Sequence, residues 1–174
     1  MITMSLDTSC LNPKYPELDE LARLSCESKI IIYFEIPGEI ETLALEKEDM
    51  REQLIRWVRL YTKQHSTTFK VGETPPLADK KYNEILTKVR EIHTPGIGKT
   101  LKIEDLNENN EDSFRVDCKL CALHIYFGGQ YFVTNDKKGF IKQGRKEKFE
   151  KAFDIKIRLL NREFIDELEK LGFE

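Results

Sequence analysis

Short apolar runs that alternate with segments of helical periodicity constrain this chain more than any other feature. Residues 2–6 (Ile-Thr-Met-Ser-Leu) and 30–34 (Ile-Ile-Ile-Tyr-Phe) have the composition of buried strands. Between them, the apolar residues of segment 16–27 recur at helical spacing. Strand, helix and strand in this order predict a βαβ unit, in which the two strands lie parallel in one sheet.

The rest of the chain continues this alternation. In the middle, the apolar spacing predicts two helices, or one bent helix, over 38–63 and another helix over 77–93, followed by an irregular acidic loop over 94–111. The last third predicts, in order, a helix at 113–127, a stop at Gly128-Gly129, strands at 131–134 and 154–159, and a helix at 161–172 with Asn161 as its N-cap. We therefore expect residues 1–174 to form a single α/β domain, a three-layer α/β/α sandwich with a central mostly parallel sheet.

Composition excludes several classes of protein. With 40% hydrophobic and 34% charged residues, the 174-residue chain is not typical of disordered proteins. No run approaches the roughly 18 apolar residues needed to cross a bilayer, and the N-terminal residues lack the features of a signal peptide, so we expect no membrane association and a cytoplasmic location. The four cysteines are interpreted as thiols. A net charge of -3 offers no overall attraction for nucleic acid, which would have to bind a local basic patch.

Two acidic residues directly follow predicted strands. Asp7 comes after the first strand and Asp136 after the third, and the carboxyl ends of parallel strands meet at the edge of the sheet where ligands bind. Asp117, in the first turns of the predicted helix 113–127, and Glu41, in the helix after the second strand, are further candidates. Clustered carboxylates favour Mg²⁺ or Mn²⁺, which activate water at phosphodiesters. Because the chain has 31 acidic residues, the alternative is that each is an ordinary surface or helix-end carboxylate.

The turns around these acids resemble those of PIN-domain ribonucleases, which include the toxins of many toxin–antitoxin pairs. That family opens with a strand ending in Asp-Thr/Ala-Ser/Asn, and this chain has Asp7-Thr8-Ser9. The family closes with a helix carrying an Asp, a Gly turn and an apolar strand ending in Thr-Asn-Asp, and this chain matches from Asp117 to Thr134-Asn135-Asp136. The resemblance covers residues 2–45 and 112–172. Segment 64–111 departs from it as a divergent helical and loop insertion.

The resemblance implies a PIN-like fold and a divalent-metal-dependent endoribonuclease that cleaves RNA phosphodiesters. It implies that the catalytic and metal-binding residues are Asp7, Glu41, Asp117 and Asp136, with Ser9 and Thr134 orienting these ligands. Glu39 is the alternative to Glu41. RNA is the implied substrate, and an antitoxin protein and a second copy of the chain, as a homodimer, are the partners to consider. The alternative function is a catalytically inactive PIN-fold module that acts as a protein-interaction partner.

A basic segment follows Asp136 directly. Residues 137–151 carry seven basic and two acidic residues, a local net charge of +5. We expect its first basic residues to bind the RNA backbone: Lys137, Lys138, Lys142 and Arg145. The alternative is an ordinary solvated helix face. We also expect Asp136→Asn to leave the fold intact or slightly stabilised, because it removes one of several crowded like charges.

Two other motifs are rejected. Residues 96–100 (Gly-Ile-Gly-Lys-Thr) resemble the end of a phosphate-binding loop, but His93 stands where the motif requires glycine. Cys118, Cys121 and His124 have the spacing of metal ligands, but the chain has no second cysteine pair to accompany them. We expect these two cysteines to be packed thiols.

Overall fold

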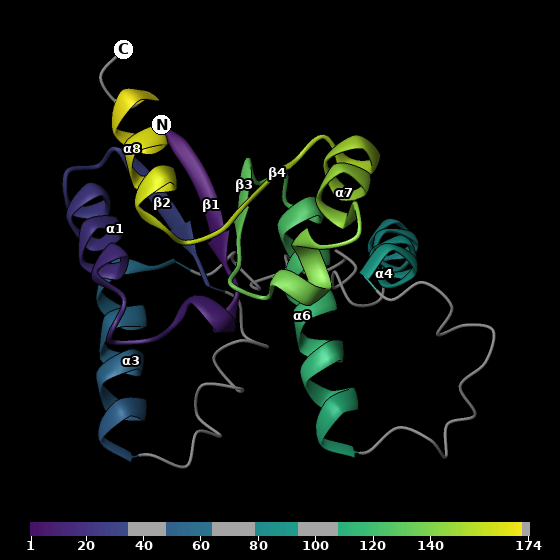
Figure 1. The fold of residues 1–174 in the computed structure, drawn as a ribbon, viewed down its shortest axis with the longest axis horizontal. Helices are drawn as coiled ribbons and strands as arrows, with labels where there is room; N and C mark the ends of the chain where they lie inside the picture. Colours follow the sequence, from purple (N-terminus) through teal and green to yellow (C-terminus); the bar gives the residue numbers. More distant parts are fainter. Residues whose placement is uncertain (35–47, 64–78, 94–107, 172–174) are drawn as a thin grey trace, which may run out of the picture.

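The computed structural model of the chain describes residues 1–34, 48–63, 79–93 and 108–171, and of residues 108–115 the backbone only. Its centre is a sheet of four parallel strands in the order β2-β1-β3-β4 (Figure 1). The strands are β1 (Ile2–Leu6), β2 (Ile30–Tyr33), β3 (Tyr131–Val133) and β4 (Lys156–Arg158). The predicted α/β class and parallel sheet are confirmed. The expected βαβ unit is formed by β1, α1 (Pro16–Cys26) and β2.

Helices cover both faces of this sheet (Figure 1). On one face lie α1, α3 (Glu48–Tyr61) and α8 (Arg162–Leu171). On the other lie α4 (Lys80–His93), α6 (Glu108–Tyr126) and α7 (Arg145–Phe153). Two short helical turns, η1 (Thr8–Cys10) and η4 (Lys137–Ile141), follow β1 and β3. None of the described helices is long and apolar enough to span a membrane.

Successive side chains of each strand point to opposite faces of the sheet, and this divides the core into two clusters. Met4 and Leu6 of β1 pack with the first helical layer, and Phe132 of β3 packs with the second. Between Met4 and Leu6, Ser5 points to the second layer, where its Oγ lies 2.8 Å from Nδ1 of the buried His124. Each face of the sheet is thus buried against helices, which is why β2 and β3 consist of apolar and aromatic residues only.

Helix α4 packs against α6 in the second layer. Leu86 and Val89 are buried there, and the rings of Tyr82 and Tyr126 meet edge to face with centroids 6.0 Å apart. The Tyr126 hydroxyl donates to Asp79 Oδ2 at 2.8 Å. Segment 64–111 therefore contributes a helix to the core, although it departs from the family pattern.

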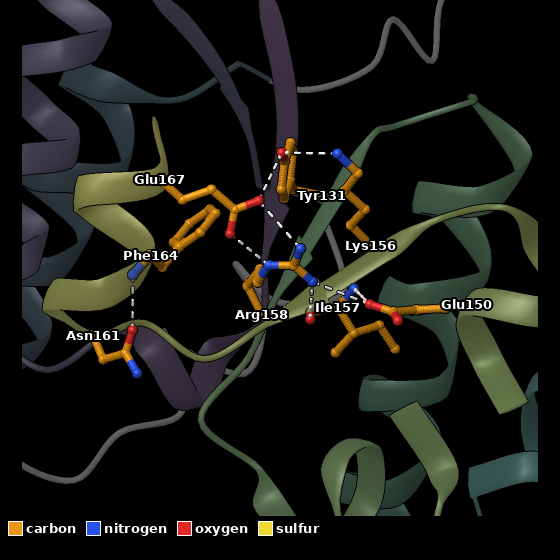
Figure 2. A network of polar contacts seen from close by, with 8 residues as sticks. All are labelled: Tyr131, Glu150, Lys156, Ile157, Arg158, Asn161, Phe164 and Glu167. Atoms are coloured by element: carbon orange, nitrogen blue, oxygen red, sulfur yellow. Dashed lines mark hydrogen bonds and ion pairs between the residues drawn. The ribbon is translucent and has the colours of Figure 1, made fainter. Parts of the chain in front are cut away.

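The edge strand β4 is held by an ionic network (Figure 2). Arg158 donates to Glu167 of α8 from Nε at 2.8 Å and from Nη2 at 3.1 Å, and to Glu150 of α7 from Nη1 at 3.1 Å. Glu150 Oε1 also accepts the backbone N–H of Ile157 at 2.9 Å. The network links helices of both layers to β4. It also provides an acceptor for a backbone N–H on the open edge of the sheet, where a strand of another chain could otherwise pair.

Some boundaries differ from the predicted ones. Helix α6 begins at Glu108, so residues 108–111 are helical and not loop, because apolar periodicity marks only the turns that pack on a core and leaves a polar extension undetected. Asp117 therefore lies in the middle of this helix and not in its first turns. The predicted N-cap is confirmed, since Asn161 Oδ1 accepts the Phe164 N–H at 3.0 Å. The part of the predicted helical region that falls on 35–47 lies outside the described residues, as does the predicted loop over 94–107.

Candidate metal centre

Asp7 is the most deeply buried carboxylate of the candidate site. Its backbone N–H donates to the Val133 carbonyl at 2.9 Å, which extends the pairing of β1 and β3 by one residue and fixes its position at the sheet edge. The side chain is 0% exposed. Oδ2 accepts hydrogen bonds from Ser9 Oγ at 2.5 Å and from Thr134 Oγ1 at 2.6 Å. Oδ1 is buried and has no hydrogen-bond partner among the described residues.

The two hydroxyls that hold Asp7 also connect the two strand-end turns. Ser9 Oγ accepts the Asn135 N–H at 2.8 Å, and Thr134 Oγ1 accepts the Asp136 N–H at 2.9 Å. Each hydroxyl therefore accepts from the turn after β3 and donates to the carboxylate after β1. This arrangement keeps Asp7 Oδ2 engaged and leaves Oδ1 as the oxygen that can bind something else.

Asp136 lies at the start of η4, and its carboxylate accepts hydrogen bonds from the backbone N–H groups of the first turn. Oδ1 accepts the Lys138 N–H and Oδ2 the Gly139 N–H, both at 3.0 Å. Oδ2 is also 3.7 Å from Nε2 of His93. The His93 imidazole is the main cause that lowers the pKa of Asp136, the two backbone donors add to it, and partial burial opposes it. Asp136 is thus held as an oriented, charged carboxylate.

His93, the last residue of α4, brings a nitrogen donor to the same place. One donor atom each of His93, Asp117 and Asp136 lie within 4.8 Å of one another. The His93 ring also meets Phe140 at an interplanar angle of 74°, with centroids 4.9 Å apart. Gly139 makes this approach possible, because a Cβ at position 139 would overlap both His93 Nε2 and Asp136 Oδ2.

Asp7 joins this group through its electrostatics. Burial raises the pKa of Asp7, hydrogen bonds from Ser9 and Thr134 and an interaction with Asp117 oppose that rise, and the charge of Asp136 adds to it. Asp7 is not one of the three residues whose donor atoms lie within 4.8 Å of one another, but its carboxylate interacts with Asp117 and Asp136, and its Oδ1 is buried without a donor among the described residues. This donor set fits a divalent cation, which would neutralise the crowded charge and coordinate that oxygen.

The structure can be compared with each residue predicted from the sequence. It brings Asp7, Asp117 and Asp136 together and places the hydroxyls of Ser9 and Thr134 on Asp7. Glu41 and its alternative Glu39 lie outside the described residues. The side chains of Lys137, Lys138 and Lys142 are exposed, while the half-buried Arg145 donates to the Lys138 carbonyl.

Sequence reasoning missed His93 and the contacts that favour the charge of Asp136. His93 has no place in the family pattern, and its only signal was a histidine at a helix end before Pro95-Gly96. The expectation that Asp136→Asn leaves the fold intact or slightly stabilised stays a prediction, and the lowered pKa of Asp136 points the other way, because contacts with His93 and two backbone donors favour the charged form. In the metal-free protein the unfavourable charge belongs to Asp7.

The cysteines of the rejected motif are packed in the core. Cys118 and Cys121 are fully buried free thiols, and burial raises the pKa of both. The neighbouring His124 binds Ser5, as described above, so the packed-thiol interpretation agrees with the structure.

The strand-end turns, α4 and α6 thus assemble one mixed oxygen and nitrogen centre at the carboxyl edge of the sheet, where parallel α/β folds bind their ligands. Comparisons of the chain with protein-family models, with curated proteins and with solved structures found no match.

Proposed function

We propose that this chain is a divalent-metal-dependent endoribonuclease with a PIN-like fold, acting in the cytoplasm. The observation that carries the proposal is the group formed by Asp117, Asp136 and His93, together with the neighbouring Asp7, whose buried Oδ1 has no donor among the described residues. The resemblance of the two strand-end turns to PIN-domain ribonucleases supports RNA as the substrate.

Each residue of the centre would have its own role in binding the ion. Asp7 Oδ1, Asp117 and Asp136 would hold Mg²⁺ or Mn²⁺, while Ser9 and Thr134 keep the second oxygen of Asp7 in place. A bound divalent ion supplies polarisation of a phosphoryl oxygen and lowers the pKa of a bound water. The backbone donors of η4 orient Asp136, whose side chain is 28% exposed and so gives solvent and substrate a way in.

The basic segment 137–151 supports the proposal that the substrate is a polyanion. Lys137 and Lys138 follow Asp136 in sequence and are exposed, as is Lys142 at the end of η4. Phosphate contacts by such residues position a nucleic acid without reading its sequence. Cations at this place would hold an RNA backbone next to the carboxylates that act on it.

Cleavage of a fluorescently labelled single-stranded RNA tests the proposal. We expect cleavage with Mn²⁺ or Mg²⁺, its loss with EDTA, and its loss in Asp117→Asn. Asp166→Asn is the matched control, because this half-exposed carboxylate pairs with Arg162 on α8, in the other helical layer. We expect the Asp166→Asn variant to cleave RNA like the wild type.

Two outcomes would contradict the proposal in different ways. Binding of the ions by the folded protein without cleavage of any RNA tested would favour the catalytically inactive PIN-fold module. Cleavage that persists in Asp117→Asn would place the activity elsewhere.

A further inference from the structure

We propose that His93 is a direct ligand of the ion in this centre, and that the centre therefore binds a transition ion such as Mn²⁺ in preference to Mg²⁺. This inference rests on the proposed function and specifies the metal that it uses. It concerns a residue from α4, in the segment for which the family pattern has no counterpart.

The separation of the donor atoms is the first observation. His93 Nε2 lies 3.7 Å from Asp136 Oδ2, which is too long for a hydrogen bond. Two ligands that are each about 2.1 Å from one ion lie roughly 3 to 4.2 Å apart, depending on the angle between them. The imidazole and the carboxylate therefore have the spacing of co-ligands, and the corresponding atom of Asp117 is within 4.8 Å of both.

The surroundings of the imidazole are the second observation. The His93 side chain is only 9% exposed, and Phe140 packs against its ring. Gly139 leaves the space into which Nε2 and Asp136 Oδ2 both reach. A buried imidazole directed at a group of carboxylates is thus held in position by packing, as metal-binding histidines are held by their surroundings.

The chemistry of the donor set then selects among ions. Mg²⁺ keeps several waters and is usually bound through one or two carboxylates, so an imidazole gives it little. Imidazole nitrogen suits first-row transition ions such as Fe²⁺ and Zn²⁺. Mn²⁺ binds most weakly of that series and also suits carboxylates, so a mixed set of carboxylates and one imidazole still favours Mn²⁺ over Mg²⁺. The group of His93, Asp117 and Asp136 offers one nitrogen and two oxygens, and Oδ1 of Asp7, whose carboxylate interacts with Asp117, is a further oxygen close by. The competing interpretation is that His93 only forms an ion pair with Asp136.

Pulsed electron paramagnetic resonance of bound Mn²⁺ distinguishes these interpretations without using catalysis. A coordinated imidazole gives a ¹⁴N modulation of the Mn²⁺ echo. We expect this modulation in the wild-type protein, its loss in His93→Gln, and its retention in His124→Gln. His124 is the matched control because it is also a buried histidine but binds Ser5 outside the centre.

Calorimetric titration with each ion measures how strongly the centre prefers Mn²⁺ to Mg²⁺. In His93→Gln we expect Mn²⁺ affinity to fall by about 10-fold to 100-fold and Mg²⁺ affinity to fall by less than about threefold. Thermal unfolding in EDTA checks that both variants remain folded at the titration temperature.

The outcomes separate the inference from the proposed function. Mn²⁺ bound without ¹⁴N modulation, modulation that persists in His93→Gln, or equal losses of Mn²⁺ and Mg²⁺ affinity would overturn the inference and leave a carboxylate-only nuclease centre intact. Failure of the folded wild-type protein to bind either ion would overturn both.

Discussion

The two oxygens of the Asp7 carboxylate meet different surroundings. Oδ2 accepts from two hydroxyls, while Oδ1 has no donor among the described residues. Burial raises the pKa of this group, so its charge opposes folding at neutral pH in the absence of a cation. The same charge becomes favourable once an ion coordinates Oδ1.

Asp7→Asn should therefore stabilise the metal-free protein. The amide oxygen can accept from Ser9 and Thr134, and the neutral amide group removes a buried charge next to Asp117 and Asp136. We expect an increase in unfolding free energy on the order of 1 kcal/mol, which corresponds to roughly 2–4 °C in Tm for a chain of this size. Calorimetry in EDTA measures this change, and added Mn²⁺ should raise the Tm of the wild type but not that of the variant.

Asp136→Asn is the matched comparison with the opposite sign. Its pKa is lowered in the folded state, so the charge contributes stability at neutral pH that the amide does not provide. We expect the metal-free variant to unfold at a lower temperature, by less than about 1 kcal/mol because asparagine can still cap η4. A more stable Asp136→Asn would show that repulsion among the carboxylates outweighs the contacts with His93 and η4.

Gly139→Ala tests whether the close approach of His93 and Asp136 matters. The added Cβ would overlap both side chains and push them apart, so we expect metal affinity to fall by about 10-fold or more. Gly144→Ala is the control, because its backbone φ of +70° makes alanine unfavourable by about 1 kcal/mol while the site is untouched. Isothermal titration with Mn²⁺ should show a loss in the first variant alone, and equal affinities would remove Gly139 from the centre.

Among the single residues of the site, the sequence predicted those that directly follow the end of a strand. Asp7 and Asp136 follow apolar strands, and parallel strands bring such residues to one edge. His93 and Gly139 were not predicted, because their proximity depends on how α4 packs against α6 and η4. That packing depends on the shapes of side chains from segments far apart in sequence, which periodicity does not encode.

Among the elements, β4 shows how a short edge strand is stabilised. Arg158 binds carboxylates from α7 and α8, and Glu150 accepts a backbone donor of the open edge. The pattern of apolar residues located this strand and the Gly128-Gly129 turn correctly, and Gly128 adopts the positive φ of +74° that favours glycine. It did not reveal the ionic network, which lies on the solvent side of the elements.

The ion pair of Arg158 and Glu167 predicts a pH dependence of stability. Arg158 lowers the pKa of Glu167, so the pair contributes stability above the ordinary glutamate pKa of 4.5, and that contribution is lost as pH falls through the lower folded-state value. We expect the difference in unfolding free energy between wild type and Glu167→Gln to be on the order of 1 kcal/mol at neutral pH, because the pair is only partly exposed and glutamine can still accept a hydrogen bond from Arg158. Urea unfolding at several pH values should show the difference shrinking below pH 4.5, and a difference that grows on acidification would contradict the assignment.

For the whole molecule, charge is unevenly distributed. A net charge of -3 opposes a polyanion, so binding of RNA under the proposed function depends on the +5 segment over 137–151. Changing Lys137, Lys138 and Lys142 to Glu should weaken RNA binding. The slope of log affinity against log salt should fall by about 0.7 for each RNA phosphate that the variant no longer neutralises. Metal affinity measured without RNA should be nearly unchanged.

The matched control carries the same change of charge elsewhere. Lys14, Arg59 and Lys170 are exposed residues near α1, α3 and α8, and their triple change to Glu tests the effect of net charge alone. Fluorescence anisotropy at increasing salt should show a smaller slope only in the first triple variant. Equal slopes in both would place the RNA path on another surface.

The strand order has a consequence for how the protein emerges from the ribosome. Strand β1 is complete after residue 6, but its second neighbour β3 begins at residue 131. At translation rates of about 5–20 residues per second, β1 waits roughly 6 to 25 s with one edge unpaired. Met4, Leu6 and the carboxylate of Asp7 remain without their final neighbours for that time. The nascent chain therefore carries an apolar strand edge that a chaperone would shield, and the metal centre cannot be complete until Asp136 has been synthesised.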